Sequence, residues 1–242
     1  MTPEEFYKAL AEKGIELNDT QKGQFETYFS ELVETNKVMN LTSITEKDQV
    51  YLKHFYDSLI LDFFDDQLIH GSLSICDVGS GAGFPSIPLK IINPDLQVTI
   101  IDSLNKRINF LKGLVEKLDL DNVDLVHGRA EELGQNKQYR EKFDLVTARA
   151  VASMTVLTEL CLPFAQKGGQ FIAMKADKAD AELQEAKYAI GLLGGKVSQQ
   201  ESFELPNEAG LRNLIFVSKT KETPKKYPRK PGTPSRKPLV KK

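Results

Sequence analysis

The chain has 242 residues, of which 40% are hydrophobic and 27% charged, as is typical of a soluble globular protein. No apolar run approaches the roughly 20 residues that a membrane span requires, so no membrane association is expected. Two distant cysteines and three histidines without ligand spacing exclude a disulfide framework and leave no metal site to propose.

The net charge of −2 hides a strong asymmetry along the chain. Residues 219–242 carry ten Lys or Arg and one Glu, a net charge of +9. The preceding 218 residues carry 22 basic and 33 acidic side chains, a net charge of −11. An acidic body with a basic end indicates a polyanionic partner for that end.

Residues 1–70 are expected to form a helical N-terminal cap. Apolar residues recur there at the spacing of a buried helix face: Phe25, Tyr28, Phe29, Leu32 and Val33. Asn18 followed by Gln21 suggests a capping box ahead of that run. Within the same region, His54 and Asp57 lie one helical turn apart and are interpreted as lying on the helix surface or as packing against the next domain.

Residues 71–219 alternate between short β-rich runs and helical patterns. Strands are expected at 73–78, 96–102, 122–128, 142–150 and 168–175, and helices at 85–93, 104–120, 153–165 and 179–195. The last strands, 196–205 and 212–219, have no long helix between them and suggest an antiparallel hairpin at one edge. The pattern predicts an α/β, Rossmann-like domain with a mostly parallel, seven-stranded sheet.

Residues 220–242 form a basic, proline-rich tail that we expect to be disordered on its own. Four basic side chains flank one aromatic ring in it, and we assign all five to RNA binding: Lys225, Lys226, Tyr227, Arg229 and Lys230. Basic groups meet phosphates, and an aromatic ring can stack on an unpaired base.

The stretch CDVGSGAGFPS, residues 76–86, places three glycines after the first expected strand. Gly79, Gly81 and Gly83 give G-x-G-x-G rather than the G-x-G-x-x-G of dinucleotide-binding folds, whose last position is occupied by Phe84. Asp77 would sit poorly beside a pyrophosphate but would suit a cofactor with an amino group and a cationic centre. These features favour S-adenosylmethionine over NAD.

Asp102 ends the second expected strand, 23 residues beyond Gly79. A carboxylate there can accept hydrogen bonds from both ribose hydroxyls of a nucleoside cofactor. NAD and S-adenosylmethionine share that ribose, so Asp102 alone does not separate them. The ligand site is expected at the carboxyl ends of the parallel strands.

Several segments resemble the glucose-inhibited division protein B family, also called the RsmG methyltransferases. They occur in order over nearly the whole chain: NLTSI (40–44), HFYDSL (54–59), DVGSGAGFPSIPL (77–89), DSLNKRINFL (102–111), HGRAEEL (127–133), VTARAVA (146–152) and KYPRKPGTPSRKPL (226–239). The resemblance implies a class I fold and methyl transfer from S-adenosylmethionine to N7 of a guanine in the 530 loop of 16S ribosomal RNA, in the bacterial cytoplasm. It implies a partner that is 16S ribosomal RNA or the small ribosomal subunit, and no obligate protein partner.

The resemblance also implies cofactor contacts, which together with the glycine loop form one candidate set. The set is Asp77, Gly79, Ser80, Gly81, Gly83, Phe84, Asp102, Ser103, Leu104, Ala130, Glu131 and Arg149. The chain departs from the family pattern at Ser86, where glycine is usual, and we expect this serine only to tighten the first helical turn.

The run TARA, residues 147–150, lacks the Asn/Asp-Pro-Pro-aromatic signature of many amine methyltransferases, and Cys161 is interpreted as a core residue rather than a nucleophile. Guanine N7 offers a free lone pair and loses no proton, so no general base is assigned. Arg149 is expected to bind the cofactor carboxylate or an RNA phosphate, and we assign it to both sets; pairing with Glu131 or Glu132 is the alternative.

Three other functions remain as alternatives, and one of them is a non-catalytic RNA-binding module that kept the pocket. A methyltransferase of a small molecule would not need the basic tail. An NAD(P)-dependent oxidoreductase fits poorly with Asp77 and Phe84.

Overall fold

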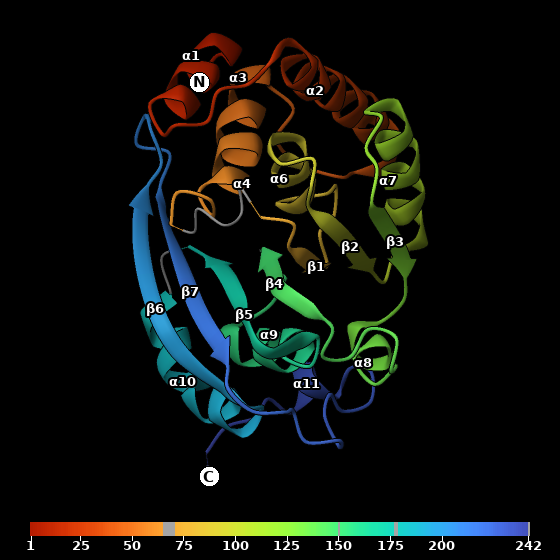
Figure 1. Ribbon diagram of the computed structural model, residues 1–242, viewed down its shortest axis with the longest axis vertical. Coiled ribbons are helices and arrows are strands. Elements are labelled where there is room, and N and C mark those ends of the chain that lie inside the picture. Colours follow the sequence, from red (N-terminus) through yellow and green to blue (C-terminus); the bar gives the residue numbers. More distant parts are fainter. Residues whose placement is uncertain (65–70, 150, 177–178, 242) are drawn as a thin grey trace.

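The computed structural model describes residues 1–64, 71–149, 151–176 and 179–241. Seven strands form one sheet in the order β3-β2-β1-β4-β5-β7-β6 (Figure 1). Their bounds are β1 Ser74–Val78, β2 Gln97–Asp102, β3 Val123–His127, β4 Phe143–Arg149, β5 Ala165–Lys175, β6 Gly195–Glu204 and β7 Leu211–Lys219. The neighbours among β1 to β5 pair in parallel, whereas β7 is antiparallel to both β5 and β6.

The expected fold class and the antiparallel hairpin are therefore confirmed, with β7 lying between β5 and the edge strand β6. The strand order reverses between β1 and β4, because β1 pairs with β2 on one side and with β4 on the other. In open α/β sheets, a ligand site lies at the carboxyl ends of the strands on either side of such a reversal.

The N-terminal region is helical, as expected, over the described residues. It contains α1 Pro3–Ala11, α2 Asp19–Met39, α3 Lys47–Val50, the π-helical turn η1 Tyr51–Tyr56 and α4 Asp57–Leu59. Asn18 and Gln21 form the expected capping box at the start of α2, each side chain accepting the other residue's N–H. Residues 65–70, which complete the expected cap, lie outside the described part of the chain.

Helices cover both faces of the sheet. α6 Ser86–Ile92 and α7 Asn105–Lys117 pack with the N-terminal helices on one face, around a core that includes Phe25, Tyr28 and Leu111. α9 Met154–Cys161 and α10 Ala179–Leu192 cover the other face. The short helix α8 Ala130–Leu133 follows β3, and α11 Thr233–Arg236 lies near α8 and α9 at the opposite end of the molecule from α1 (Figure 1).

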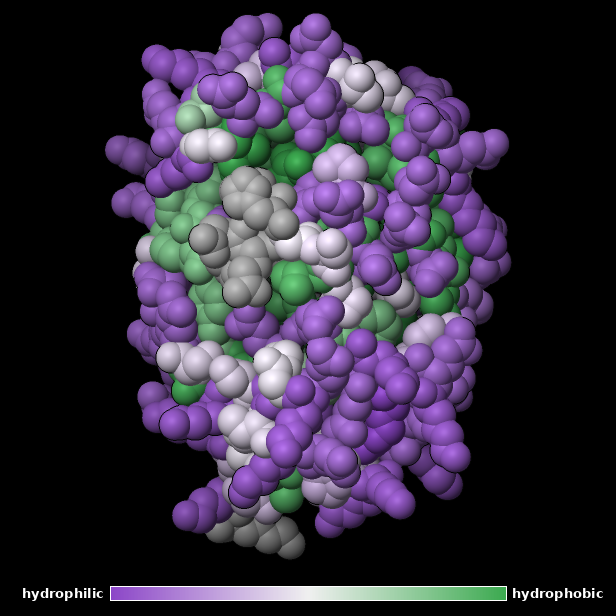
Figure 2. Space-filling view, viewed as in Figure 1, coloured by the Kyte–Doolittle hydropathy of each residue, from purple (hydrophilic) through white to green (hydrophobic). Residues whose placement is uncertain are grey.

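The two cysteines, Cys76 and Cys161, are fully buried in the second core, as expected. Among the described residues, no helix is both long enough and apolar enough to cross a bilayer. Figure 2 shows hydrophilic side chains around most of one face of the molecule, with apolar side chains gathered toward its middle.

Candidate functional site

The glycine loop follows β1 directly and has left-handed backbone at three positions. The φ angles are +77° at Gly79, +64° at Gly81 and +102° at Gly83. A Cβ at Gly83 would lie 2.7 Å from Ile87 Cγ1 and 2.8 Å from the Tyr28 hydroxyl. That hydroxyl donates a 2.6 Å hydrogen bond to the Ala82 carbonyl. The N-terminal cap therefore holds the loop in place through Tyr28.

Asp102 ends β2 with its side chain almost wholly buried. Its Oδ1 accepts from the Leu104 N–H at 2.8 Å, and its Oδ2 accepts from the Gly81 N–H and the Arg107 guanidinium, both at 3.3 Å. The carboxylate thus joins the glycine loop to the start of α7. Arg107, which sequence reasoning did not select for this site, adds positive charge beside it.

A pocket of about 400 Å³ opens between the carboxyl ends of β1 and β2, α8 and α9. Five of the sequence-selected cofactor residues line it: Gly79, Asp102, Ser103, Ala130 and Glu131. Apolar side chains, including Ile101, Val156 and Leu160, form part of the wall. An apolar slot with a few convergent polar groups suits a nucleoside-like ligand.

Asp77 lies beneath the pocket rather than in its wall. It is fully buried, and Ser86 donates to its Oδ2 from the hydroxyl at 2.7 Å and from the N–H at 3.3 Å. Burial raises the pKa of Asp77 to about 7, against the opposing effect of these hydrogen bonds. Ser86 was expected only to tighten the first helical turn, but its hydroxyl also donates a hydrogen bond to the Asp77 carboxylate.

The Asp77 Oδ1 is buried and has no hydrogen-bond partner within the described structure. An orphaned carboxylate oxygen at the foot of the glycine loop is costly, and such groups cluster at functional sites. The donors that would satisfy it are a ligand amine or an ordered water.

Phe84 points into the interface between the cap and the sheet. Its ring stacks on His54 at 4.6 Å and on Tyr28 at 5.3 Å between centroids, and the Arg149 guanidinium lies 4.9 Å from its centre. The ring is 4% exposed and is absent from the pocket wall. Phe84 therefore supports the end of the glycine loop, whereas a contact with the cofactor was expected.

Arg149, at the end of β4, pairs with Asp57 of the cap at 2.9 Å. Neither Glu131 nor Glu132, the alternatives weighed from the sequence, is its partner. Asp57 also accepts from Arg212 of β7 at 2.8 Å, so one buried carboxylate joins η1 and α4 to two strands. Arg212 had no motif to indicate this role, because its partner is 155 residues away in the sequence.

His54 lies in the same cluster and is neutral. The Arg149 guanidinium lies 3.3 Å from His54 Nδ1, and Thr42 Oγ1 lies 2.8 Å from Nε2. Since a guanidinium only donates, Nδ1 accepts and Nε2–H donates to Thr42. Burial, with the nearby Arg149 charge, lowers the pKa of His54 to about 3. The expected packing of His54 and Asp57 against the next domain is confirmed.

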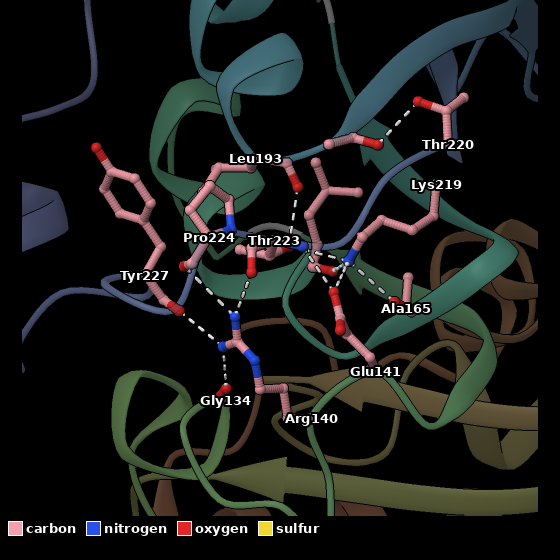
Figure 3. A network of polar contacts seen from close by, with 12 residues as sticks. Gly134, Arg140, Glu141, Ala165, Leu193, Lys219, Thr220, Thr223, Pro224 and Tyr227 are labelled. Carbon is pink, nitrogen blue, oxygen red and sulfur yellow. Dashed lines mark hydrogen bonds and ion pairs between the residues drawn. The ribbon is translucent and has the colours of Figure 1, made fainter.

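The C-terminal tail is ordered, so the expectation of disorder is wrong. The Lys219 ammonium is buried against the carbonyls of Leu162 and Ala165 and the Thr223 hydroxyl (Figure 3). Arg140 donates to the carbonyls of Thr223 and Tyr227 at 2.6 and 2.7 Å. Leu162, Ala165 and Arg140 lie 54 to 87 residues before the tail residues that they contact, so local composition gave no sign of them.

Two tail residues selected for RNA binding face the protein instead. The Tyr227 ring is 7% exposed and belongs to the second core, so it does not offer a free face to a base. The Arg229 guanidinium makes a bidentate contact with Glu159 at 2.6 to 3.2 Å. Lys225, Lys226 and Lys230 are exposed, as an RNA contact requires.

Four more of the selected cofactor residues lie outside the pocket wall. They are Ser80, Gly81 and Gly83 in the glycine loop and Leu104 directly before α7. Among the described residues, no group of His, Cys, Asp or Glu is arranged to hold a metal ion.

The chain matches the sequence profile of the family described as GidB, rRNA small subunit methyltransferase G, over residues 21–212. It is 60% identical to ribosomal RNA small subunit methyltransferase G of Staphylococcus saprophyticus, over 96% of both chains. It is 58% identical to the protein of the same name from Lactobacillus acidophilus, over 99% of this chain and all of that one.

Solved structures share the fold at low sequence identity. A SAM-dependent methyltransferase from Aquifex aeolicus has a TM-score of 0.52 at 17% identity and covers 74% of this chain and 96% of its own. A sarcosine dimethylglycine methyltransferase from Galdieria sulphuraria has a TM-score of 0.55 at 10% identity and covers 85% of this chain and 100% of its own. On the strength of the profile match and these full-length relatives, the chain belongs to the GidB family of rRNA small subunit methyltransferases.

Proposed function

We propose that this protein transfers a methyl group from S-adenosylmethionine to N7 of a guanine in the 530 loop of 16S ribosomal RNA. Membership of the rRNA methyltransferase family over essentially the whole chain carries this proposal. The glycine loop, the buried Asp102 and the pocket beside them supply what the cofactor requires.

The lining of the pocket supports S-adenosylmethionine as its ligand on chemical grounds. Asp102 is the group to bind the ribose hydroxyls, because its carboxylate is held at the end of β2 by two backbone N–H groups. The adenine would lie against apolar wall residues between Ala130 and Val156, with Ser103 and Glu131 around it. Gly79 lets the methionine end approach the backbone, since a Cβ there would already lie 3.0 Å from Val151.

Asp77 would act mainly on the loop. Its hydrogen bonds to Ser86 fix the first turn of α6 directly after the glycines, and its unpartnered oxygen leaves one site for an amino group. Ser80, Gly81, Gly83 and Phe84 set the backbone path of the loop. Arg149 is committed to Asp57 and could reach a substrate only by exchanging that partner.

When bound, S-adenosylmethionine supplies an electrophilic methyl group on a sulfonium sulfur. Transfer to N7 would form the N7–carbon bond as the sulfur–carbon bond breaks, and would remove no proton from the base. The protein would therefore need no general base, and catalysis would rest on orientation of the two reactants.

The acceptor RNA would lie across the open side of the pocket and along the exposed basic side chains of the tail, Lys225, Lys226 and Lys230. The positive charge of these lysines favours phosphates over any uncharged small substrate. A bacterial cytoplasmic location follows from a ribosomal substrate.

Calorimetry with S-adenosylmethionine and NAD, followed by labelled methyl transfer to purified 16S RNA and small subunits, tests the proposal. We expect binding of S-adenosylmethionine only, and transfer to the 16S substrate. Asp102→Ala should weaken cofactor binding at least tenfold, whereas Asp121→Ala, at an exposed carboxylate outside the pocket, should not. Binding of NAD alone would indicate an oxidoreductase, and cofactor binding without transfer to RNA would indicate a small-molecule methyltransferase.

A further inference from the structure

The C-terminal segment from Arg229 to Arg236 reaches the rim of the cofactor pocket. Gly232 and Ser235 line the pocket together with Glu131, although they come from the far end of the chain. The short helix α11 lies beside α9 (Figure 1). Val156 and Leu160 of α9 also line the pocket. The tail is therefore part of the pocket's structure.

One hydrogen bond joins the tail directly to a residue that the proposed function places beside the cofactor. The Gly232 N–H donates to Glu131 Oε1 at 2.8 Å. Gly232 has a φ of +76°, a conformation that favours glycine and that turns this N–H toward α8. Without the tail, the Glu131 carboxylate would lose this partner in a site where it is 8% exposed.

Arg229 fixes the segment three residues earlier. Its guanidinium and its own backbone N–H both bond the Glu159 carboxylate, which is 1% exposed on α9. A bidentate, charge-assisted contact of this kind defines orientation as well as distance. The contact between Arg229 and Glu159 therefore fixes the position of Gly232 and Ser235 in the pocket wall.

A separate anchor holds the preceding part of the tail. The Gln135 amide donates to the carbonyls of Lys225 and Pro228, and Arg140 donates to Tyr227. Gly134, after α8, lets Pro228 approach, since a Cβ there would lie 2.9 Å from Pro228 Cγ. Residues 225–228 thus have anchors that are separate from the contacts of Arg229 and Gly232.

We propose that residues 229–236 form the last wall of the S-adenosylmethionine pocket, and that their docking and cofactor binding stabilise each other. This inference rests on the proposed function. It assigns Arg229, through its pairing with Glu159, to positioning the pocket wall rather than to RNA, and Ser235 becomes a side chain that limits the size of the pocket. Coupling of this kind is reciprocal: whatever the tail adds to cofactor affinity, the cofactor adds to tail docking.

Amide hydrogen exchange of the full-length protein, with and without saturating S-adenosylhomocysteine, tests the coupling without any substitution. We expect exchange over 229–236 to slow at least fivefold on ligand addition, with little change over 219–227. Protection of the peptides around Asp102 and Ala130 with no change over 229–236 would overturn the inference. If no peptide is protected, the ligand does not bind and the proposed function itself fails.

A pair of tail variants gives an independent readout. Ser235→Trp places a bulky side chain in the pocket wall and should raise the Kd for S-adenosylhomocysteine at least tenfold. Lys237→Trp, at an exposed position two residues away and outside the pocket wall, should change it less than twofold. Equal Kd values for the two variants would contradict the assignment. Both positions are exposed, so thermal unfolding of the ligand-free variants should match that of the parent protein.

Discussion

Gly81 and Gly83 are two residues apart in one loop, yet the structure gives them different tasks. Both have positive φ, but a Cβ at Gly81 meets no atom within 4 Å, whereas one at Gly83 meets three side chains within 3.0 Å. Backbone strain alone costs about 1–2 kcal/mol for an alanine in this region. Overpacking adds about 1–3 kcal/mol.

Gly83→Ala should therefore lower the free energy of unfolding by about 1–3 kcal/mol more than Gly81→Ala does. Urea unfolding of the two variants, monitored in parallel with the parent protein, measures the difference. Equal losses would show that the Tyr28 and Ile87 side chains move aside without cost.

Asp77 and His54 make opposite contributions to stability as pH changes. The folded state keeps Asp77 protonated up to about pH 7, above its ordinary pKa of 3.8, so this group alone makes stability fall as pH rises between those values. The folded state keeps His54 neutral down to about pH 3, below its ordinary 6.5, so this group alone makes stability rise with pH over that window.

Single substitutions should separate the two. Between about pH 4.8 and 5.8, Asp77→Asn should make the slope of unfolding free energy against pH more positive by up to about 1.4 kcal/mol per pH unit. His54→Asn should make it more negative by a similar amount. Urea unfolding across that window measures both slopes, and a shift of the same sign in both variants would refute the assigned protonation states.

At the scale of elements, Asp57 is the polar junction between the helical cap and the sheet. Its side chain is 6% exposed and takes one guanidinium from β4 and one from β7, through Arg149 and Arg212. Removing the carboxylate would leave two largely buried cations without their partner, which is far more costly than losing an exposed pair.

Asp57→Ala should lower the free energy of unfolding by about 2–4 kcal/mol. Glu34→Ala, which breaks the exposed pair with Lys37 on α2, serves as the control and should cost less than about 1 kcal/mol. Thermal or urea unfolding of both variants gives the comparison. A cost for Asp57→Ala no larger than that of the control would mean that the cap is held by its apolar contacts alone.

The elements themselves were largely predictable, because each has a local signal. Alternating β-rich and helical patterns gave all seven strands, and Asn18 with Gln21 gave the start of α2. The short helices α8 and α11 were not expected, since four residues are too few to show a helical period. β5 begins three residues before the expected position, at Ala165, through its irregular pairing with β4.

The site was predictable where the backbone dictates it and unpredictable where distant elements meet. Gly79 and Asp102 fall at strand ends and line the pocket together, as their spacing indicated. The orientation of Phe84 toward His54, and the pairing of Arg229 with Glu159, depend on contacts between segments far apart in the chain. No local stretch of sequence encodes those contacts. The basic residues of the tail, including Arg229, were therefore expected to be exposed.

For the whole molecule, the charge that remains available to RNA is smaller than composition suggested. Lys219 is buried and Arg229 is paired, whereas the three lysines selected for RNA binding, Lys225, Lys226 and Lys230, are exposed on one short stretch. Four other basic residues of the tail are exposed too: Lys221, Arg236, Lys237 and Lys241. Each lysine that contacts a phosphate contributes roughly 0.7 to 0.9 to the slope of log affinity against log salt.

Replacing those three lysines with alanine should weaken binding of 16S RNA and reduce the salt slope by about 2–3. A control with the same change in net charge replaces three exposed lysines elsewhere, Lys8, Lys37 and Lys187, and should leave the slope nearly unchanged. Filter binding over a range of salt concentrations measures both. Identical slopes for the two triple variants would remove the tail from the RNA interface.

The central claim is that this protein methylates N7 of a guanine in the small-subunit RNA. The most direct measurement is reduction followed by aniline cleavage of 16S RNA from cells with and without the gene, because that chemistry cuts at N7-methylguanine. We predict one cleavage, in the 530 loop, that disappears without the gene and returns when the gene is restored. An unchanged cleavage pattern would contradict both the target atom and the substrate.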